Sequence, residues 1–560
     1  MASSPPPRTA ATPAAVLAWL LAALALAAGI GLREPWPPDE PRFVLAARHM
    51  AESGDWLIPR RGDEIYAHKP PPFMWLLALA HRLTGEWRIA FLLPSWLAAL
   101  GTLALAADLA RRLWGRRAAA WAAGALFASL QFGLQAKRAQ IDMVLVFLTT
   151  LGLWALARAL LRAEGRRLAL LGGMASGLGT VTKGVGFLPL LAFLPARLAR
   201  HRPPLAPLLA AAFAGLLLGA SVWLAPLALR ALLDPGPEIA AYLEEILLRQ
   251  TAERYFDPWH HHQPAWYFLQ VIATLWLPGA LLLPWLLPAW WRRLRRREPR
   301  TLLLVGWAGL VLLFFSLSPG KREVYILPAL PALCVAAAPM LPVLLRRSWP
   351  RRLLLGYLLL LPLGMLAVAS ALGSEGKLSA RLLAERGLAP GELEALARGL
   401  LLSALALAAS LGALARGLPA AVFIATVTLW SAYGLLLVPP LDRSSSARGL
   451  MAETAARLGP GRELGLVGWR EQHLLQLPVP ATTFGFERPL GEQLADAEAW
   501  LRAAPARRAL FALEALLPDC ARLAATPLGR ANRRAYRLLP GEALAADCRL
   551  VIPGDLAAPE

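Results

Sequence analysis

Long apolar runs, separated by short polar turns, dominate the first three quarters of the chain. A bilayer core of about 30 Å is crossed by about 20 mostly apolar helical residues, and this length predicts about thirteen spans. We expect the first as an anchor rather than a cleaved signal peptide, since no positive region stands well before it. The predicted spans are residues 13–32, 88–110, 117–135, 143–162, 168–182, 184–199, 205–231, 266–290, 301–317, 323–345, 353–372, 398–415 and 417–438.

Two parts of the chain depart from this pattern. Segment 33–87 holds one apolar run, Pro71 to Leu83, which is too short to cross and predicts an interfacial or re-entrant helix. After residue 438 the sequence turns polar, and short apolar runs alternate with helical stretches. We therefore predict an all-α polytopic membrane domain, residues 1–438, followed by a small soluble α/β domain, residues 439–560.

Composition agrees with a membrane protein, because 57% of the residues are hydrophobic and only 17% are charged, against roughly 25% charged in soluble domains. The net charge of +21 resides in arginine clusters between alternate apolar runs rather than on a soluble basic face. This placement argues against nucleic-acid binding and indicates cytoplasmic loops. It predicts a cytoplasmic N-terminus, with segment 33–87 and the C-terminal domain outside. The clusters lie at residues 111–117, 158–167, 197–202, 292–297 and 346–352.

Lysine is rare in this chain, and its positions therefore direct the search for chemistry. Of 58 basic residues only five are lysine, and the predicted topology places all five outside. A compact ammonium can meet a phosphate oxygen in a pocket too tight for a guanidinium. Retention by chance is the competing interpretation. It fits best at Lys377, and at Lys137 it is about as good an interpretation as a functional role. A functional role is favoured for Lys69, Lys183 and Lys321, each beside proline or glycine at the edge of a span.

Carboxylates are few on the same face. Asp39 and Glu40 follow Pro37 and Pro38, and we expect both in a stiff, non-helical turn. Asp142 lies at the mouth of a span, where an ionisable residue is a functional candidate. A helix N-cap is an equally good interpretation of Asp142.

Histidines and cysteines add less. His260, His261 and His262 lie in an external loop, and adjacent histidines cannot all face one ion. A metal site at His260 and His262 is thus less favoured than a solvated cluster. Cys520 and Cys548 share the predicted external domain and could pair in an oxidising compartment, with two free thiols as the alternative.

A series of short motifs follows in a characteristic order along residues 30 to 345. They are Pro38 to Phe43, Ser53 to Trp56, Tyr66 with His68 to Pro71, Arg138 with Asp142, Thr182 to Gly184, and Lys321 with Tyr325 and Pro328. Together they resemble the bacterial aminoarabinose transferase and protein mannosyltransferase-like superfamily, which comprises GT-C glycosyltransferases that use polyprenyl-phosphate sugars.

The resemblance implies sugar transfer from undecaprenyl phosphate to an external acceptor, within a cavity between the first loop and the spans. Asp39 matches the essential acid of that family, Asp142 its second external acid, and Lys69 a lipid-phosphate ligand. One position departs, because relatives commonly carry Glu where this chain has His68. Any role of that Glu is therefore in doubt here.

Physical chemistry leads to a similar site, because breaking a sugar-to-phosphate bond builds negative charge on the leaving phosphate, which cations must stabilise. Asp39 would orient the acceptor or deprotonate a hydroxyl, with inversion at the anomeric carbon. Since lysine and arginine can neutralise the phosphate, no metal or other cofactor is required. The predicted catalytic residues are Asp39, Glu40 and Asp142, and the predicted substrate or lipid-phosphate ligands are Arg42, Tyr66, Lys69, Lys183, Arg254, Lys321 and Tyr325.

The predicted partners are a polyprenyl-phosphate-linked sugar, membrane lipids, and lipid A, another glycan or a protein as acceptor, in a multi-pass protein of the bacterial inner membrane. Aminoarabinose is the candidate sugar, and a protein O-mannosyltransferase-like enzyme is the alternative. The competing class is a lipid or solute transporter. Transporters often show repeat symmetry and broken helices at matching positions of two halves, which this sequence lacks.

Overall fold

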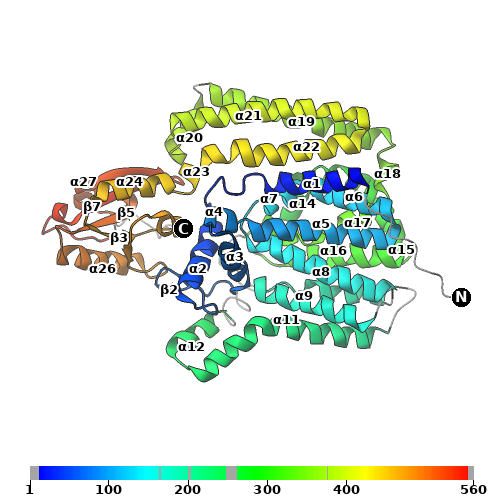
Figure 1. Ribbon diagram of the computed structural model, residues 1–560, viewed down its shortest axis with the longest axis horizontal. Helices are drawn as coiled ribbons and strands as arrows, with labels where there is room; N and C mark the ends of the chain where they lie inside the picture. The colour runs from blue at the N-terminus through cyan, green and yellow to red at the C-terminus, as the bar shows by residue number, and fades with distance from the viewer. Residues whose placement is uncertain (1–11, 163–164, 200–203, 247–261, 375, 553–560) are drawn as a thin grey trace.

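The computed structural model describes residues 12–162, 165–199, 204–246, 262–374 and 376–552. Long helices run side by side in a bundle, and a mixed β-sheet built from the C-terminal residues stands beyond one end of it (Figure 1). Between bundle and sheet lie α2 (Glu40–Ser53) and α3 (Pro72–Thr84). The predicted external segment thus lies between the spans and the C-terminal residues.

Seven helical stretches in the described residues are long and apolar enough to cross a membrane, or eight if one pair bent by 104°, Tyr267–Leu275 with Gly279–Arg295, is a single span. They are Trp87–Trp114, Ile141–Arg162, Leu205–Leu233, Pro299–Leu317, Ser348–Gly373, Pro390–Arg416 and Leu418–Leu437. The chain is thus a multi-pass membrane protein, whereas the count of about thirteen spans stays a prediction.

The helices and short 3-10 segments of the bundle have the following bounds, with η6 a π-helix. They are α1 (Pro13–Ala27), α4 (Trp87–Ala90), α5 (Leu93–Trp114), α6 (Arg116–Ala128), α7 (Leu130–Ala136), α8 (Ile141–Arg162), α9 (Arg166–Lys183), η1 (Leu188–Ala192), α10 (Phe193–Arg197), α11 (Leu205–Leu233), α12 (Pro237–Leu243), α14 (Tyr267–Leu275), η3 (Gly279–Leu282), α15 (Leu283–Arg295), α16 (Pro299–Leu317), η4 (Glu323–Ile326), α17 (Ala329–Ala337), α18 (Leu341–Leu344), α19 (Ser348–Gly373), α20 (Lys377–Arg386), α21 (Pro390–Ser410), η5 (Leu411–Arg416), α22 (Leu418–Ala432) and η6 (Tyr433–Leu437).

Several predicted spans are interrupted in the structure. Residues 117–135 divide at Ser129 into α6 and α7, and residues 184–199 form the short η1 and α10. Residues 323–345 divide into η4, α17 and α18, which are rich in proline. Most residues of α17 are buried, and irregular backbone at membrane depth is tolerated where protein surrounds it. Apolar length alone therefore did not predict the breaks.

Helices α9 and α11 approach each other through glycines spaced four residues apart. A Cβ at Gly173 would lie 1.8 Å from the Ala212 carbonyl oxygen, and one at Gly177 would lie 2.1 Å from that of Leu216. On the facing helix, a Cβ at Gly215 would lie 2.1 Å from the Leu170 carbonyl oxygen. Small residues at this spacing let two membrane helices meet backbone to backbone. The contact positions Lys183, the last residue of α9.

We expect Gly177→Leu to separate α9 from α11 and to destabilise the protein by about 1 to 3 kcal/mol or more, the usual cost of overpacking. The measurement is the thermal midpoint of the purified protein in detergent. Gly309→Leu in α16 is the matched control, because a Cβ there meets nothing within 4 Å. Equal midpoints for the two variants would contradict the close contact.

Residues of segment 33–87 form a compact unit at the end of the bundle. Strands β1 (Arg60–Arg61) and β2 (Glu64–Ile65) pair antiparallel, and α2 packs on α3 through an edge contact between the rings of Phe43 and Phe73, whose centroids lie 5.4 Å apart. Helix α3 coincides with the apolar run that was predicted as an interfacial or re-entrant helix, and it is only 13 residues long. Helix α2 begins at Glu40, so the expectation of a non-helical turn holds for Asp39 alone.

The C-terminal sheet has the strand order β4-β3-β5-β7-β6, with β3 parallel to β4 and β5, and β7 antiparallel to β5 and β6. Strands β3, β5 and β7 form from short apolar runs of this part of the chain, and the side chains of β3 and β5 are largely buried. The elements are α23 (Pro439–Ser445), α24 (Arg448–Leu458), β3 (Glu463–Val467), α25 (Glu471–Gln476), β4 (Ala481–Thr483), α26 (Leu490–Ala503), β5 (Arg508–Leu513), η7 (Glu514–Leu516), α27 (Asp519–Ala524), β6 (Thr526–Ala531), β7 (Arg534–Pro540) and η8 (Gly541–Ala543).

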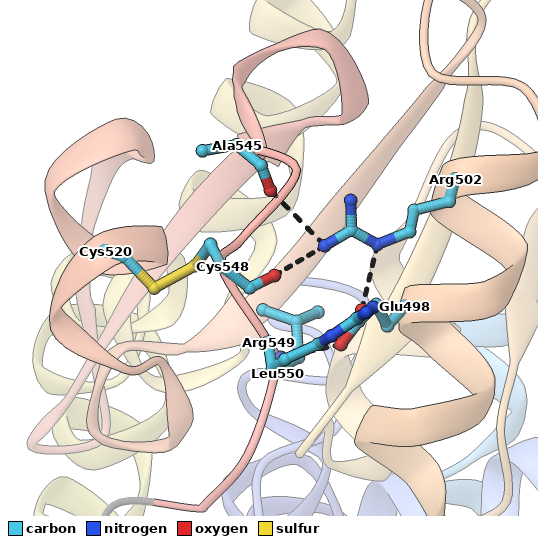
Figure 2. The surroundings of a disulfide bond; sticks show 7 residues. All are labelled: Glu498, Arg502, Cys520, Ala545, Cys548, Arg549 and Leu550. Atoms are coloured by element: carbon cyan, nitrogen blue, oxygen red, sulfur yellow. Dashed lines mark hydrogen bonds and ion pairs between the residues drawn. A yellow bond between two sulfur atoms is a disulfide. The ribbon is translucent and has the colours of Figure 1, made fainter.

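Cys520 and Cys548 form a disulfide bond between α27 and the chain that follows η8 (Figure 2). Arg502 of α26 donates hydrogen bonds to the Cys548 and Ala545 carbonyl oxygens, and Glu498 accepts from Arg502, Arg549 and the Leu550 amide. Of the two alternatives left open by the sequence, the structure has the paired cysteines. The bond ties the last described residues to the sheet.

The sheet and segment 33–87 are joined by charged contacts. Arg42 Nε lies 2.9 Å and Arg61 Nη1 3.3 Å from Glu471 Oε1, and Arg61 also pairs with Glu487. The Glu34 amide donates to Asp442 Oδ1 over 2.8 Å. These contacts fix α2 from the side opposite the bundle. The domain boundary at residue 439 stays a prediction.

Candidate active site

Asp39 lies at the start of α2, where segment 33–87 meets the bundle. Its Oδ2 accepts hydrogen bonds from Gln140 Nε2 at 2.9 Å and from Arg322 Nη2 at 3.0 Å, and its Oδ1 lies 3.8 Å from Arg42 Nη1. Burial alone would raise the pKa of Asp39, but the positive charges of Arg322 and Arg42 outweigh burial and lower the pKa below its ordinary value. Asp39 is therefore ionised at neutral pH.

The carboxylate of Glu40, the next residue, accepts hydrogen bonds from one arginine and two backbone amides. Both of its oxygens accept from the Arg33 guanidinium, one also from the Trp36 amide at 2.7 Å and the other from the Ala139 amide at 2.9 Å. Arg33 also donates to the Lys137 carbonyl oxygen at 3.0 Å. This buried ion pair joins α2 to the turn between α7 and α8 and thereby places Asp39 beside Gln140. The arrangement favours a positioning role for Glu40.

A second carboxylate stands close by. Asp142, in the first turn of α8, forms an ion pair with Lys183 at the end of α9, and the Lys183 ammonium lies 5.1 Å from the ring centre of Tyr325. Lys183 lowers the pKa of Asp39 through its positive charge, and Asp142 raises the pKa of Arg322 through its negative charge. The two carboxylates and their cations thus form one electrostatic cluster. Helices α2, α8 and α9 and the turn before η4 supply it.

Lys321 and Arg322 are adjacent but point to different partners. Lys321 is buried, and its ammonium donates to the carbonyl oxygens of Ser318 at 2.6 Å and Gln263 at 3.2 Å. Burial lowers the pKa of Arg322, and the charge of Asp39 more than offsets this effect, so the pKa lies above its ordinary value. Arg322, rather than the predicted Lys321, therefore brings this turn's positive charge to Asp39.

Arg42 and Tyr66 extend the cluster toward the C-terminal sheet. The Tyr66 ring is buried, and burial raises the pKa of its hydroxyl to about 12, although the charge of Arg42 opposes the shift. Lys69 is half-buried near His68. His68 Nε2 lies 3.2 Å from Glu487 Oε1, so the position where relatives commonly carry Glu faces a carboxylate from the C-terminal residues. Burial lowers the pKa of His68, which leaves this imidazole neutral at pH 7.

Two predicted site residues, Arg254 and His260, lie outside the described residues. His262 is exposed and forms an isolated antiparallel bridge with Gly320. Within the described parts of the chain, no group of three or more His, Cys, Asp and Glu side chains could hold a metal ion.

Sequence reasoning missed Arg322, Gln140 and Arg33. Arg322 was hidden by the emphasis on rare lysines, since it stands directly beside one of them. Gln140 carries no charge, but its place two residues before Asp142 was a usable signal. Arg33 follows the first predicted span, on the face that should be poor in arginine. In the structure Arg33 pairs with the buried acid Glu40, so its unexpected position was a usable signal.

Known proteins share this sequence pattern and fold. A family profile of dolichyl-phosphate-mannose-protein mannosyltransferases matches residues 68–226. The undecaprenyl phosphate-alpha-4-amino-4-deoxy-L-arabinose arabinosyl transferase of Pseudomonas paraeruginosa is 34% identical over 345 residues, 60% of this chain and 61% of that protein. The corresponding transferase of an Enterobacter species is 30% identical over 55% of each chain. These alignments span little more than half of the relatives.

A solved structure matches nearly the whole chain. ArnT from Cupriavidus metallidurans, crystallised with undecaprenyl phosphate, superposes with a TM-score of 0.75 over 97% of this chain and 100% of that one, at 23% identity. The fold and the charged cluster thus define a multi-pass membrane protein with the ArnT architecture. More particularly, the resemblance to the aminoarabinose transferase and protein mannosyltransferase-like superfamily, stated above from the motifs, is confirmed.

Proposed function

We propose that this protein is a GT-C glycosyltransferase that moves a sugar from undecaprenyl phosphate to an acceptor outside the cytoplasm. The observation that carries the proposal is the cluster in which Asp39, half-buried and ionised, lies between Arg42 and Arg322 with Lys183 close by. Such a cluster offers fixed positive charge for a leaving phosphate and a carboxylate for the acceptor or the sugar. The names of the relatives support aminoarabinose, carried on undecaprenyl phosphate, as the sugar. Lipid A is the proposed acceptor.

In the proposed reaction, an acceptor oxygen attacks the anomeric carbon from the face opposite the phosphate, and the bond between that carbon and the phosphate oxygen breaks. The phosphate leaves with the electron pair, and Lys69, Lys183 and Arg322 stabilise its charge. Attack from the opposite face inverts the anomeric centre. No divalent metal is needed in this proposal, because these cations neutralise the phosphate.

The lowered pKa of Asp39 bears on the acceptor. A carboxylate with a depressed pKa is a weak general base, since catalysis is most effective when the pKa lies near the working pH. An acceptor phosphate, as on lipid A, is already ionised and needs no base. Asp39 then orients the reactants rather than removing a proton. This argument favours lipid A over a hydroxyl acceptor.

The proposed placement is the bacterial inner membrane, with the cluster and the C-terminal sheet on the periplasmic side. The C-terminal ends of α15 and α18, which adjoin two arginine clusters, lie at the end of the bundle away from that sheet (Figure 1). Arginine-rich loops favour the cytoplasmic side. The Cys520–Cys548 disulfide supports an oxidising compartment for the sheet.

The test is transfer by the purified protein in nanodiscs, with undecaprenyl-phosphate-linked aminoarabinose as donor and lipid A as acceptor, followed by mass spectrometry. We expect lipid A to gain the mass of one aminoarabinose residue for each molecule of undecaprenyl phosphate released, and no gain without donor. In sealed proteoliposomes, donor movement across the bilayer without a mass gain would instead identify a transporter.

The match of residues 68–226 to the mannosyltransferase profile makes protein O-mannosylation the second candidate. The same assay distinguishes it when polyprenyl-phosphate mannose and a serine- and threonine-rich peptide replace donor and acceptor. A mannosylated peptide together with unmodified lipid A would show that the protein is a protein O-mannosyltransferase instead.

A further inference from the structure

A pocket far from Asp39 lies at the arginine-rich end of the bundle. It has a volume of about 350 Å³ and lies between α15 and residues 339–347, which follow α17 and contain α18. Four arginines line it: Arg292, Arg293, Arg296 and Arg347. The rest of its wall is mainly apolar and includes Trp285, Ala289, Met340, Val343 and Leu344.

The four guanidinium groups have no carboxylate partner among the residues that the structure describes. Elsewhere at this end of the bundle such compensation exists, since Arg111 and Arg112 both pair with Asp108. Glu298, the acid nearest in sequence, instead caps α16 by accepting from the Thr301 amide at 3.0 Å. Four like charges around one pocket repel one another and favour an anionic occupant.

The occupant must also cover an apolar wall. Arg292, Arg296 and Arg347 are exposed, whereas Met340 and Leu344 are buried at the base of the pocket. A soluble anion would satisfy the arginines and leave the wall uncovered. A phospholipid offers both parts, with a phosphate for the guanidinium groups and acyl chains for the wall.

We propose that this pocket binds an anionic glycerophospholipid of the cytoplasmic leaflet, with its phosphate among Arg292, Arg293, Arg296 and Arg347 and its acyl chains along Trp285, Ala289 and Val343. Basic pockets between membrane helices on the cytoplasmic side suit such head groups. The site is separate from the cluster around Asp39, and no step of the proposed sugar transfer involves it.

The test is native mass spectrometry of the full chain in detergent, titrated with tetraoleoyl cardiolipin. We expect the variant R292A/R293A/R296A/R347A to lose affinity by about tenfold or more, since each basic residue near an anionic lipid contributes on the order of 1 kcal/mol. The matched control is R116A/R117A/R166A/R167A, which removes four exposed arginines at the starts of α6 and α9 that do not line this pocket. Its affinity should change by less than about threefold. Equal losses would show general charge attraction only and overturn the proposal.

A second variant tests the proposal independently, in case the quadruple variant fails to fold. Ala289→Trp fills the wall without changing any charge, and we expect it also to weaken cardiolipin binding, with an unchanged thermal midpoint in lipid-free detergent. Unaltered binding by Ala289→Trp would contradict the seating of acyl chains. Glycerol phosphate, which has no acyl chain, should fail to compete, and competition as strong as that of cardiolipin would identify a site for a soluble anion instead.

Discussion

Asp39→Asn is expected to reduce sugar transfer by about a hundredfold or more while leaving insertion and folding unchanged, since misplacing reacting groups by about 1 Å can cost about a hundredfold in rate. The asparagine side chain keeps the size of aspartate and can still accept from Gln140, but it removes the negative charge between Arg42 and Arg322. The measurement is initial rate per mole of purified protein in nanodiscs, with donor and acceptor saturating.

Asp55→Asn is the matched control, because it is the same substitution in the same external segment. The Asp55 Oδ1 accepts from the Leu57 amide at 3.0 Å, and an asparagine oxygen can accept that bond equally well. Its transfer rate should equal that of the unaltered protein. If Asp39→Asn retained full activity at equal expression, Asp39 would not be a catalytic residue.

Glu40→Gln is expected to destabilise the protein by about 3 to 5 kcal/mol, the range for removing one partner of a buried ion pair. The amide removes the charge that faces Arg33 and presents a second hydrogen-bond donor to it, while Arg33 stays buried. We expect the thermal midpoint to fall and the chain between α1 and α2 to become sensitive to protease. Activity should fall with stability, since Glu40 places Asp39.

Glu52→Gln, at the exposed end of the same helix, is the control and should leave the midpoint unchanged because its pair with Arg48 is exposed. A double-mutant cycle with Arg33→Met isolates the interaction energy of the ion pair. The double variant should be more stable than Glu40→Gln alone. An unaltered midpoint for Glu40→Gln would show that the pair is not structural and would return Glu40 to the list of catalytic candidates.

Much of the candidate site could be predicted from local sequence. Asp39 follows two prolines directly after an apolar run, and Asp142 and Lys183 each stand at the edge of one, so all three were expected on one face of the membrane. The structure brings Asp142 and Lys183 into an ion pair and places Lys183 near enough to act on Asp39. Their catalytic roles stay predictions.

Other parts of the site could not be predicted this way. Lys321 and Arg322 are neighbours with the same charge, and only the path of the chain before η4 decides which one reaches Asp39. Glu471 and Glu487 are more than 400 residues from the arginines they bind, and nothing local marks them. Pairing across such distances depends on how the C-terminal sheet sits against α2.

The sequence by itself determined that this chain crosses a membrane several times, which end of its spans carries the arginine clusters, and which acids and lysines stand at the opposite end. These are local properties, since hydrophobic length and charge placement act on each segment separately. The tertiary structure alone decided where predicted spans break, that Cys520 pairs with Cys548, and that Arg322 and Gln140 hold Asp39. Such features depend on the direction of individual side chains, which is set by packing between segments that are distant in the chain.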